Sequence, residues 1–132
     1  MKLKALLLIS TLGLIFSSCA KEAGEGGNSS IYGKVIAHNY NAEFTNLRGI
    51  YPAPDEEVYL IYGNDRSYSE RVRTNYEGVF EFKYLRPGDY TVYVYSKDST
   101  LTLVAEMYAV TKAVTIDKRK QEVDAGEIKV FR

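Results

Sequence analysis

Alternating apolar and polar residues, in short runs separated by glycine, asparagine and proline, dominate the chain from position 31 onward. Successive side chains of a strand point to opposite faces, so an alternation with a period of two indicates strands with one buried face. Turn-forming residues between the runs mark where the strands end. The pattern predicts an all-β domain with strands at about residues 30–38, 57–62, 67–74, 79–84, 90–97, 101–110, 114–116 and 122–131.

The sharpest part of the pattern surrounds residues 75–78, Asn-Tyr-Glu-Gly. These four residues are typical of a turn in which Gly78 takes a positive φ. Phe80 and Phe82 follow and share one face of the next strand, where they are expected to fill the core. Roughly seven or eight such short strands in about 100 residues predict a Greek-key β-sandwich of two sheets.

Two segments are less clear. Residues 101–110 alternate as a strand does, but they also contain helical spacing, and we favour the strand because the flanking segments are rich in β pattern. In residues 122–131 the alternating apolar residues move from odd-numbered positions, such as Val123, to even-numbered positions, such as Ile128. A β-bulge near Gly126 would explain this slip, because a bulge inserts one extra residue into a strand.

The first 18 residues have a different character from the rest of the chain. Lys2 and Lys4 precede an apolar run from Ala5 to Phe16, and the small residues Ser17 and Ser18 follow. A basic start, an apolar centre and a small-residue exit are typical of an export signal. The apolar run falls short of the roughly 20 residues that a membrane-spanning helix needs. We therefore interpret residues 1–18 as a signal peptide.

The sequence contains one cysteine, Cys19. Residues 16–19, Phe-Ser-Ser-Cys, resemble the lipobox of bacterial lipoproteins, in which cleavage precedes a cysteine that carries diacylglycerol. The alternative is an ordinary signal peptide followed by an unpaired thiol. The resemblance implies a lipid on Cys19 and an anchor in the cell envelope of a Gram-negative bacterium. The expected location is the outer membrane, with the periplasmic face and the cell surface both left open.

Residues 19–30 are small, polar and rich in glycine. Such a segment buries too little apolar surface to offset the entropy of ordering, so it is expected to be a flexible tether. A coil of this length would place the domain, residues 31–132, about 20 Å from the bilayer. Loss of Lys2 and Lys4 with the signal peptide would leave 15 basic and 17 acidic residues.

A longer stretch, residues 74–92, resembles the core signature of carboxypeptidase-regulatory-like domains, which belong to the transthyretin-like sandwiches. The shared features are a turn ending in Gly78, Phe80-x-Phe82, Leu85, a Pro-Gly pair at 87–88 and Tyr90-x-Val92. Residues 31–35 and 54–60 are similar to the first two strands of that family. The resemblance implies the same β-sandwich, but it says little about function, because such folds host many activities.

Candidate catalytic groups are few. Hydroxyisourate hydrolases share the sandwich but need a histidine pair, and this chain has a single histidine, His38. No second histidine or free cysteine could join it in a nucleophilic or metal site. Glu56 and Glu57 are adjacent, so they should point to opposite faces of a strand. We expect no enzymatic activity, no metal, no cofactor and, without a basic cluster, no nucleic-acid partner.

Tyrosine is unusually frequent, with 12 residues, whereas tryptophan is absent. The alternation places Tyr32, Tyr59, Tyr93 and Tyr95 opposite the predicted core face. Outward tyrosines can stabilise a sheet by cross-strand contacts alone. They can also form an exposed aromatic surface for a protein partner or a sugar ring.

Residues 39–55 form a long connection between predicted strands. This connection carries Tyr40, Phe44 and Tyr51, which makes it too apolar for a free loop. It is expected either to cap one end of the sandwich or to serve as a recognition loop. Later in the chain, Asp98-Ser99-Thr100 resembles a short O-glycosylation acceptor, which would modify Ser99 or Thr100.

Two functions of different classes follow. In the first, the protein is a non-catalytic envelope lipoprotein that binds a protein or glycan through its tyrosines and long loop. In the second, the domain is a structural accessory of a larger envelope assembly with no ligand of its own. A fixed, exposed aromatic surface would favour the first function.

Overall fold

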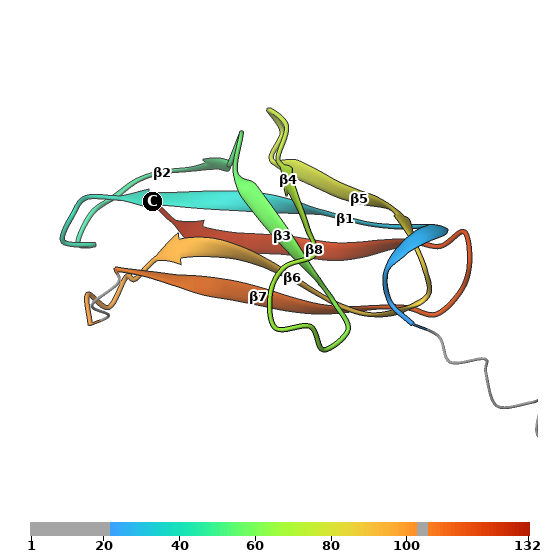
Figure 1. Ribbon diagram of the computed structural model, residues 1–132. Helices are drawn as coiled ribbons and strands as arrows, with labels where there is room; N and C mark the ends of the chain where they lie inside the picture. Colours follow the sequence, from blue (N-terminus) through green and yellow to red (C-terminus); the bar gives the residue numbers. More distant parts are fainter. Residues whose placement is uncertain (1–21, 103–105) are drawn as a thin grey trace, which may run out of the picture.

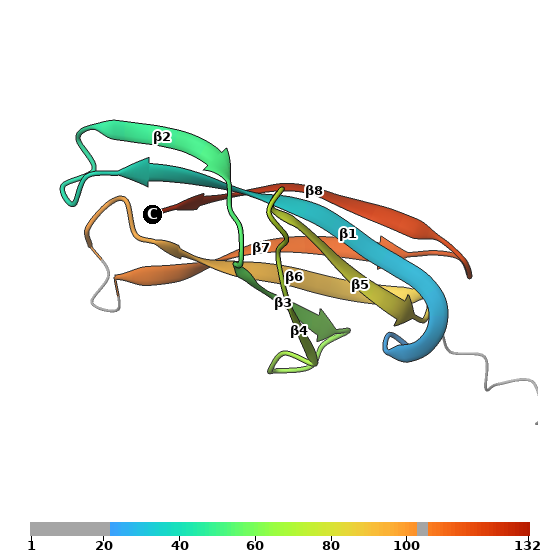
Figure 2. The same ribbon diagram turned by 90° about the horizontal axis from the view of Figure 1, so that it is seen from above.

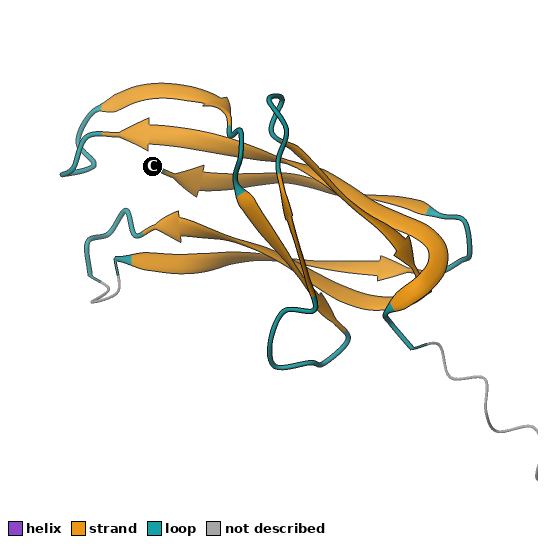
Figure 3. Cartoon of the chain, turned by 45° about the horizontal axis from the view of Figure 1, so that its top comes forward, coloured by secondary structure: helices purple, strands orange, loops and turns teal. Residues whose placement is uncertain are grey.

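The computed structural model describes residues 22–102 and 106–132, and this part of the chain is all-β. Its eight strands form two four-stranded sheets that pack as the layers of a β-sandwich (Figure 3). The strands are β1 (Glu25–Tyr40), β2 (Leu47–Pro52), β3 (Glu57–Tyr62), β4 (Glu70–Arg73), β5 (Val79–Leu85), β6 (Gly88–Lys97), β7 (Met107–Ile116) and β8 (Glu122–Phe131). The predicted fold class, an all-β sandwich, is confirmed, whereas the Greek-key connection stays a prediction.

The first sheet, sheet A, is built around β1. Along one side of β1, β5 pairs antiparallel with its first half and β2 with its second half (Figure 1). Along the other side, β8 runs parallel to β1 over almost its whole length. The register between β1 and β8 shifts after Tyr32, and Gly126 has a φ of 81° at this point. The predicted bulge near Gly126 is therefore confirmed.

The second sheet, sheet B, has the order β4-β3-β6-β7, and all of its neighbours are antiparallel. The core lies between the two sheets and is filled by the apolar half of each alternation. Phe80 and Phe82 are both fully buried, as predicted, and their rings meet edge to face with centroids 6.0 Å apart. Branched aliphatic side chains from both sheets surround them, which suits the pleated surfaces of facing strands.

The predicted turn at residues 75–78 is present. Gly78 has a φ of 75° and its amide donates to Asn75 O at 3.0 Å. The Asn75 side chain accepts from the amides of Glu77 and Val79, which closes the turn. Gly78 O then accepts from the Val35 amide at 2.8 Å, so the turn is held against β1.

The start of the fold differs from the prediction. Residues 25–30, expected in the flexible tether, belong to β1. Ser29 is buried, its Oγ donating to Lys118 O at 2.9 Å and accepting from the Gln121 amide at 3.1 Å. The composition of this segment does not reveal its partners, because they lie some 90 positions further along the chain. Cys19 and the proposed signal peptide lie outside the described residues.

Three predicted strands also have different limits. The connection 39–55 contains an additional strand, β2, and β4 is shorter than the predicted 67–74. Of the segments predicted as strands at 101–110 and 114–116, residues 107–116 form one continuous strand, β7, and residues 103–105 lie outside the described residues. Leu101 and Met107, two apolar residues of the predicted strand 101–110, are both exposed, and Met107 is the first residue of β7, the edge strand of sheet B. Among the described residues, no helix is long and apolar enough to cross a membrane.

Candidate functional site

Four tyrosines gather on the outer surface of sheet B. Tyr59 comes from β3, Tyr93 and Tyr95 come from β6, and Tyr68 lies just before β4. The rings of Tyr59 and Tyr93 stack with centroids 4.8 Å apart and planes 9° apart. Tyr68 and Tyr95 meet the Tyr59 ring edge to face at 5.0 Å and 5.6 Å. We call Tyr59, Tyr68, Tyr93 and Tyr95 the tyrosine face.

Strand register explains why these rings meet. Tyr59 lies directly opposite Tyr93 in the pairing of β3 with β6. The alternating neighbours Val58, Leu60 and Val92 are fully buried, so the tyrosines must point away from the core. Directly opposed residues have Cβ atoms about 4.5–5.5 Å apart, a spacing that suits stacked rings.

The tyrosine face is partly exposed and partly fixed by its own contacts. Tyr68 and Tyr95 are 46% and 43% exposed, whereas Tyr59 and Tyr93 are half-buried beneath them. The Tyr59 hydroxyl donates to Glu57 Oε2 at 2.9 Å. Glu57 in turn lies 3.3 Å from the Arg73 guanidinium and 3.6 Å from that of Arg71. The face is therefore a rigid aromatic surface with charged groups along one border.

Both half-buried tyrosines resist ionisation. The hydrogen bond to the Glu57 carboxylate is the main reason that the pKa of Tyr59 is raised, and burial adds to it. Burial is the main reason that the pKa of Tyr93 is raised, with the neighbouring Tyr95 as the next cause. The hydroxyls therefore stay neutral donors and acceptors at physiological pH, which suits recognition of polar groups.

The opposite border of the tyrosine face is open. On β7, Ala109 lies opposite Tyr95 and Thr111 lies opposite Tyr93. Both β7 side chains are small and exposed, so they do not rise above the neighbouring rings. A flat ligand, such as a sugar ring or an extended peptide, could rest on Tyr95 and reach over β7.

The other residues expected on a binding surface do not join the tyrosine face. Tyr32 projects from β1 on the outside of sheet A, which is the other layer of the sandwich. Tyr51 lies on β2 and is exposed. Tyr40 is the last residue of β1, and Phe44 lies in the connection that follows it. The structure therefore does not bring these seven residues onto one surface, because alternation predicts which side chains point outward but not which sheet they belong to.

The long connection 39–55 is neither a simple cap nor a free loop. Its β2 strand pairs with β1, and its tip at 41–46 turns back at the end of the sandwich. The rings of Tyr40 and Phe44 pack against Phe131 of β8, with centroids 5.8 Å and 6.1 Å away. Part of the connection thus packs against the end of β8 through this aromatic cluster, while the rest of it forms an edge strand.

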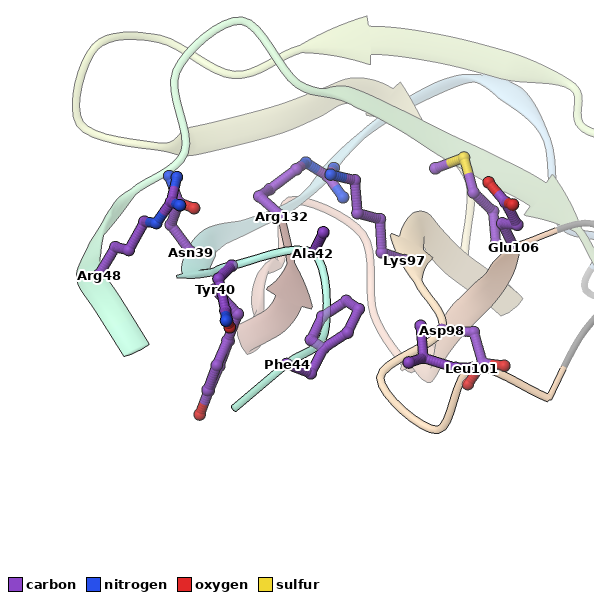
Figure 4. Close-up of a pocket in the computed structure, with 12 residues that line it drawn as sticks. Asn39, Tyr40, Ala42, Phe44, Arg48, Lys97, Asp98, Leu101, Glu106 and Arg132 are labelled. Atoms are coloured by element: carbon purple, nitrogen blue, oxygen red, sulfur yellow. The ribbon is translucent and has the colours of Figure 1, made fainter. Parts of the chain in front are cut away.

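A pocket of about 1060 Å³ opens beside this cluster. Figure 4 shows the tip that carries Phe44 facing the β6–β7 connection, which carries Asp98 and Leu101. Arg132 closes the inner side, where its guanidinium pairs with Glu56 at 2.6 Å. Figure 2 shows that this end lies opposite the end where β1 begins. The pocket is a second, more polar candidate site.

The Asp98-Ser99-Thr100 segment at the rim of the pocket is held by its own aspartate. Asp98 is buried, and its carboxylate accepts from the Thr100 amide and hydroxyl and from the Thr102 amide. Through these contacts Asp98 stabilises the turn that follows it, a role common for aspartate. Glycosylation of Ser99 or Thr100 stays a prediction.

The structure adds little to the candidate catalytic groups. His38 packs edge-on against Phe131. Burial lowers the pKa of His38, and the positive charge of Lys129 lowers it further. Glu56 binds Arg132 whereas Glu57 binds Tyr59, so the two carboxylates are directed apart, as predicted. No group of three potential metal ligands occurs within residues 22–102 and 106–132.

Tyr68 is the residue of the tyrosine face that sequence reasoning missed. It falls within the predicted strand 67–74, but β4 begins only at Glu70, and Tyr68 meets Tyr59 because β4 pairs with β3 immediately after it. Only the pairing of these two strands could have predicted its place.

Compared with known protein families and with curated protein sequences, the chain matches none of them.

Proposed function

We propose that this protein is a non-catalytic, lipid-anchored module of the bacterial cell envelope that binds a protein or glycan partner through the tyrosine face. The observation that carries the proposal is the contact of four tyrosines on one outer sheet surface, with two of the rings more than 40% exposed. Tyrosine is enriched at binding interfaces because its rigid ring offers large contact area and a polar tip.

Fixed geometry supports binding over a purely structural role. Stacking and edge-to-face contacts order the rings in advance, so little side-chain entropy remains to be lost when a ligand binds. A structural accessory domain would need the same rings only for sheet stability. The two functions therefore differ in what happens when the outermost rings are removed.

The test removes the two most exposed rings with the Tyr68→Ser, Tyr95→Ser double variant. Tyr32→Ser is the matched control, since Tyr32 is also a strand tyrosine with an exposed outer ring but lies on sheet A. The assays are a glycan array and pull-down from envelope extracts, followed by titration of any ligand found. We expect the double variant to weaken binding at least tenfold, about 1.4 kcal/mol, and the control to leave it unchanged. Equal binding by all three proteins would contradict recognition through this surface.

Anchoring rests on the lipobox resemblance of residues 16–19. The spacer between the anchor and the folded domain would be short, because the Gly24 amide already donates a hydrogen bond to the Tyr90 hydroxyl. Four residues separate Cys19 from Gly24, and a flexible chain of that length would span about 11 Å instead of about 20 Å. Cys19→Ser should abolish palmitate labelling and release the protein from membranes; continued labelling would contradict the anchor.

The carboxypeptidase-regulatory-like relationship also remains a proposal. Its support is the role of the signature residues. Phe80, Phe82 and Leu85 are fully buried, Gly78 ends a tight turn and Gly88 begins β6, and a Cβ at either glycine would collide with backbone atoms. Each signature residue thus has a physical reason to recur in a sandwich of this kind.

A further inference from the structure

The edges of a β-sheet expose unpaired backbone groups, and proteins usually protect them with charges, proline, bulges or short strands. Three of the outer strands here follow this rule. β8 carries four charged residues and the bulge at Gly126, β4 has four residues of which two are arginine, and β2 has six residues and ends in Pro52. A fourth outer strand, β5, pairs only with β1 and carries the exposed charged residues Glu81 and Lys83 among its seven residues. All four edges are poor templates for another strand.

β7 is the exception. It has ten residues with one charged side chain, Lys112, and contains neither glycine nor proline. Its pairing with β6 is regular over all ten positions, without a bulge. It is the last strand of sheet B, and among the described residues no strand pairs with its outer edge (Figure 1). A long, flat and nearly uncharged edge of this kind is suited to accept another strand.

The side chains along β7 are also suited to close pairing. Ala109, Thr111 and Ala113 are small and exposed on the outer face. On the inner face, Tyr108 and Val110 are half-buried, with Val110 packed against the border of the core. An added strand would bury more of both residues, which are apolar surface at the open side of the sandwich.

We propose that β7 pairs with β7 of a second copy of this chain, antiparallel and centred on Thr111. In this register each Thr111 faces its counterpart, and Tyr108 faces Val114 of the second copy. Threonine pairs and aromatic–β-branched pairs are both favourable across strands. Lys112 faces Val110 of the second copy, so the two lysines do not oppose each other. A register centred on Lys112 would place like charges directly opposite, which is destabilising.

Such pairing would join two copies of sheet B into one continuous sheet. The symmetry axis of an antiparallel pair stands perpendicular to the sheet, so both tyrosine faces would lie on the same side. Two linked binding surfaces raise the apparent affinity for a repetitive partner without new contacts. The pairing itself does not depend on the proposed function, because it rests on the edge of β7 alone.

A single strand pair buries less area than the roughly 1,200–2,000 Å² of a stable interface, so the dimer should be weak in dilute solution. The test therefore traps it by cross-linking the full chain in membranes of expressing cells. Thr111→Cys is treated with a short bis-maleimide linker, and the parent chain with Cys19 measures the background. Ala113→Cys is the matched control, since its counterpart in the second copy would lie about 14 Å away at 3.4 Å per residue.

We expect Thr111→Cys to give at least ten times more cross-linked dimer than Ala113→Cys. Co-expressed Ala109→Cys and Ala113→Cys should restore the dimer, because these two positions are opposed in the proposed register. Equal cross-linking at all positions, absence of dimer, or cross-links only to a different protein would each overturn the proposal.

A charge test gives independent evidence without cross-linking. Thr111→Lys places like charges at the centre of the interface and should reduce co-precipitation of two differently tagged chains at least tenfold. Thr111→Glu alone should do the same, and mixing the two variants should restore co-precipitation. Because Thr111 is exposed, neither variant should impair folding, and circular dichroism checks this. Failure of the mixture to recover pairing would contradict the Thr111-centred register.

Discussion

Gly78 and Gly63 show how differently two single residues can depend on their surroundings. Both have positive φ values, 75° and 54°, which glycine adopts without steric cost. A Cβ at Gly78 would lie 2.7 Å from Val35 O and 3.1 Å from the Ala53 amide nitrogen, whereas a Cβ at Gly63 would meet nothing within 4 Å. Gly78 is therefore required both by its backbone conformation and by the close approach of β1.

Alanine substitution at these two positions should separate the two effects. Gly63→Ala should lower the free energy of unfolding by about 1–2 kcal/mol, the cost of a left-handed conformation. Gly78→Ala should cost clearly more, because the backbone of β1 must also move. Urea denaturation of both variants measures the difference, and equal destabilisation would show that the turn can shift without disturbing β1.

At the scale of elements, strands β3 and β6 carry four tyrosines whose pKa values are raised by their surroundings. Burial raises the pKa of Tyr62, Tyr90 and Tyr93, and the Glu57 carboxylate raises that of Tyr59. The Tyr62 hydroxyl also donates to Glu70 Oε2 at 2.7 Å, so its ionisation would place two negative charges together. The same strands that form the tyrosine face thus make sheet B sensitive to high pH.

The free energy of unfolding should fall as the pH rises above about 10, the ordinary pKa of tyrosine. In that range the unfolded chain loses protons that the folded chain keeps, so alkali favours unfolding; below it the stabilisation is fully present. The Tyr59→Phe, Tyr93→Phe double variant should flatten this decline, with Tyr76→Phe, at a position 95% exposed, as the control. Urea denaturation across the alkaline range measures it, and an unchanged slope in the double variant would contradict this origin.

At the scale of the whole molecule, residues 24–30, which precede the predicted domain boundary at Ile31, are part of the fold. The Tyr90 hydroxyl accepts from the Gly24 amide at 2.9 Å and donates to Arg86 O at 2.6 Å, which resembles the tyrosine corner of other β-sandwiches. The Arg86 amide donates to Gly24 O at 2.8 Å. Ser29 ties the same segment to the β7–β8 connection. The start of β1 therefore closes one end of the sandwich.

A chain shortened to begin at Ile31 should be less stable than one that begins at Glu22. It would lose the bonds of Gly24 and Ser29, and at ~0.5–1.5 kcal/mol for each hydrogen bond we expect a loss of about 3 kcal/mol or more. Urea denaturation of the two chains measures this difference. Equal stability would mean that the true domain boundary lies at Ile31, as the composition alone suggested.

Local patterns predicted much of the fold. Alternation identified the buried faces of β3, β5 and β6, and the glycines located the turn at 75–78 and the bulge in β8. Each of these features depends on neighbours in the sequence, through the side-chain period of two and the φ range open to glycine. The strand at the start of β1 and the merged β7 escaped prediction, because distant pairing decides them.

The candidate site was predicted only in part. Sequence by itself determined that Tyr59, Tyr93 and Tyr95 point outward, since the residues between them must fill the core. Tertiary structure alone decided that these three meet Tyr68, that Tyr32 belongs to the opposite layer, and that the edge of β7 stays open. The physical reason is that alternation fixes the side of a strand, whereas the sheet and the neighbour of each strand depend on long-range hydrogen bonds and packing.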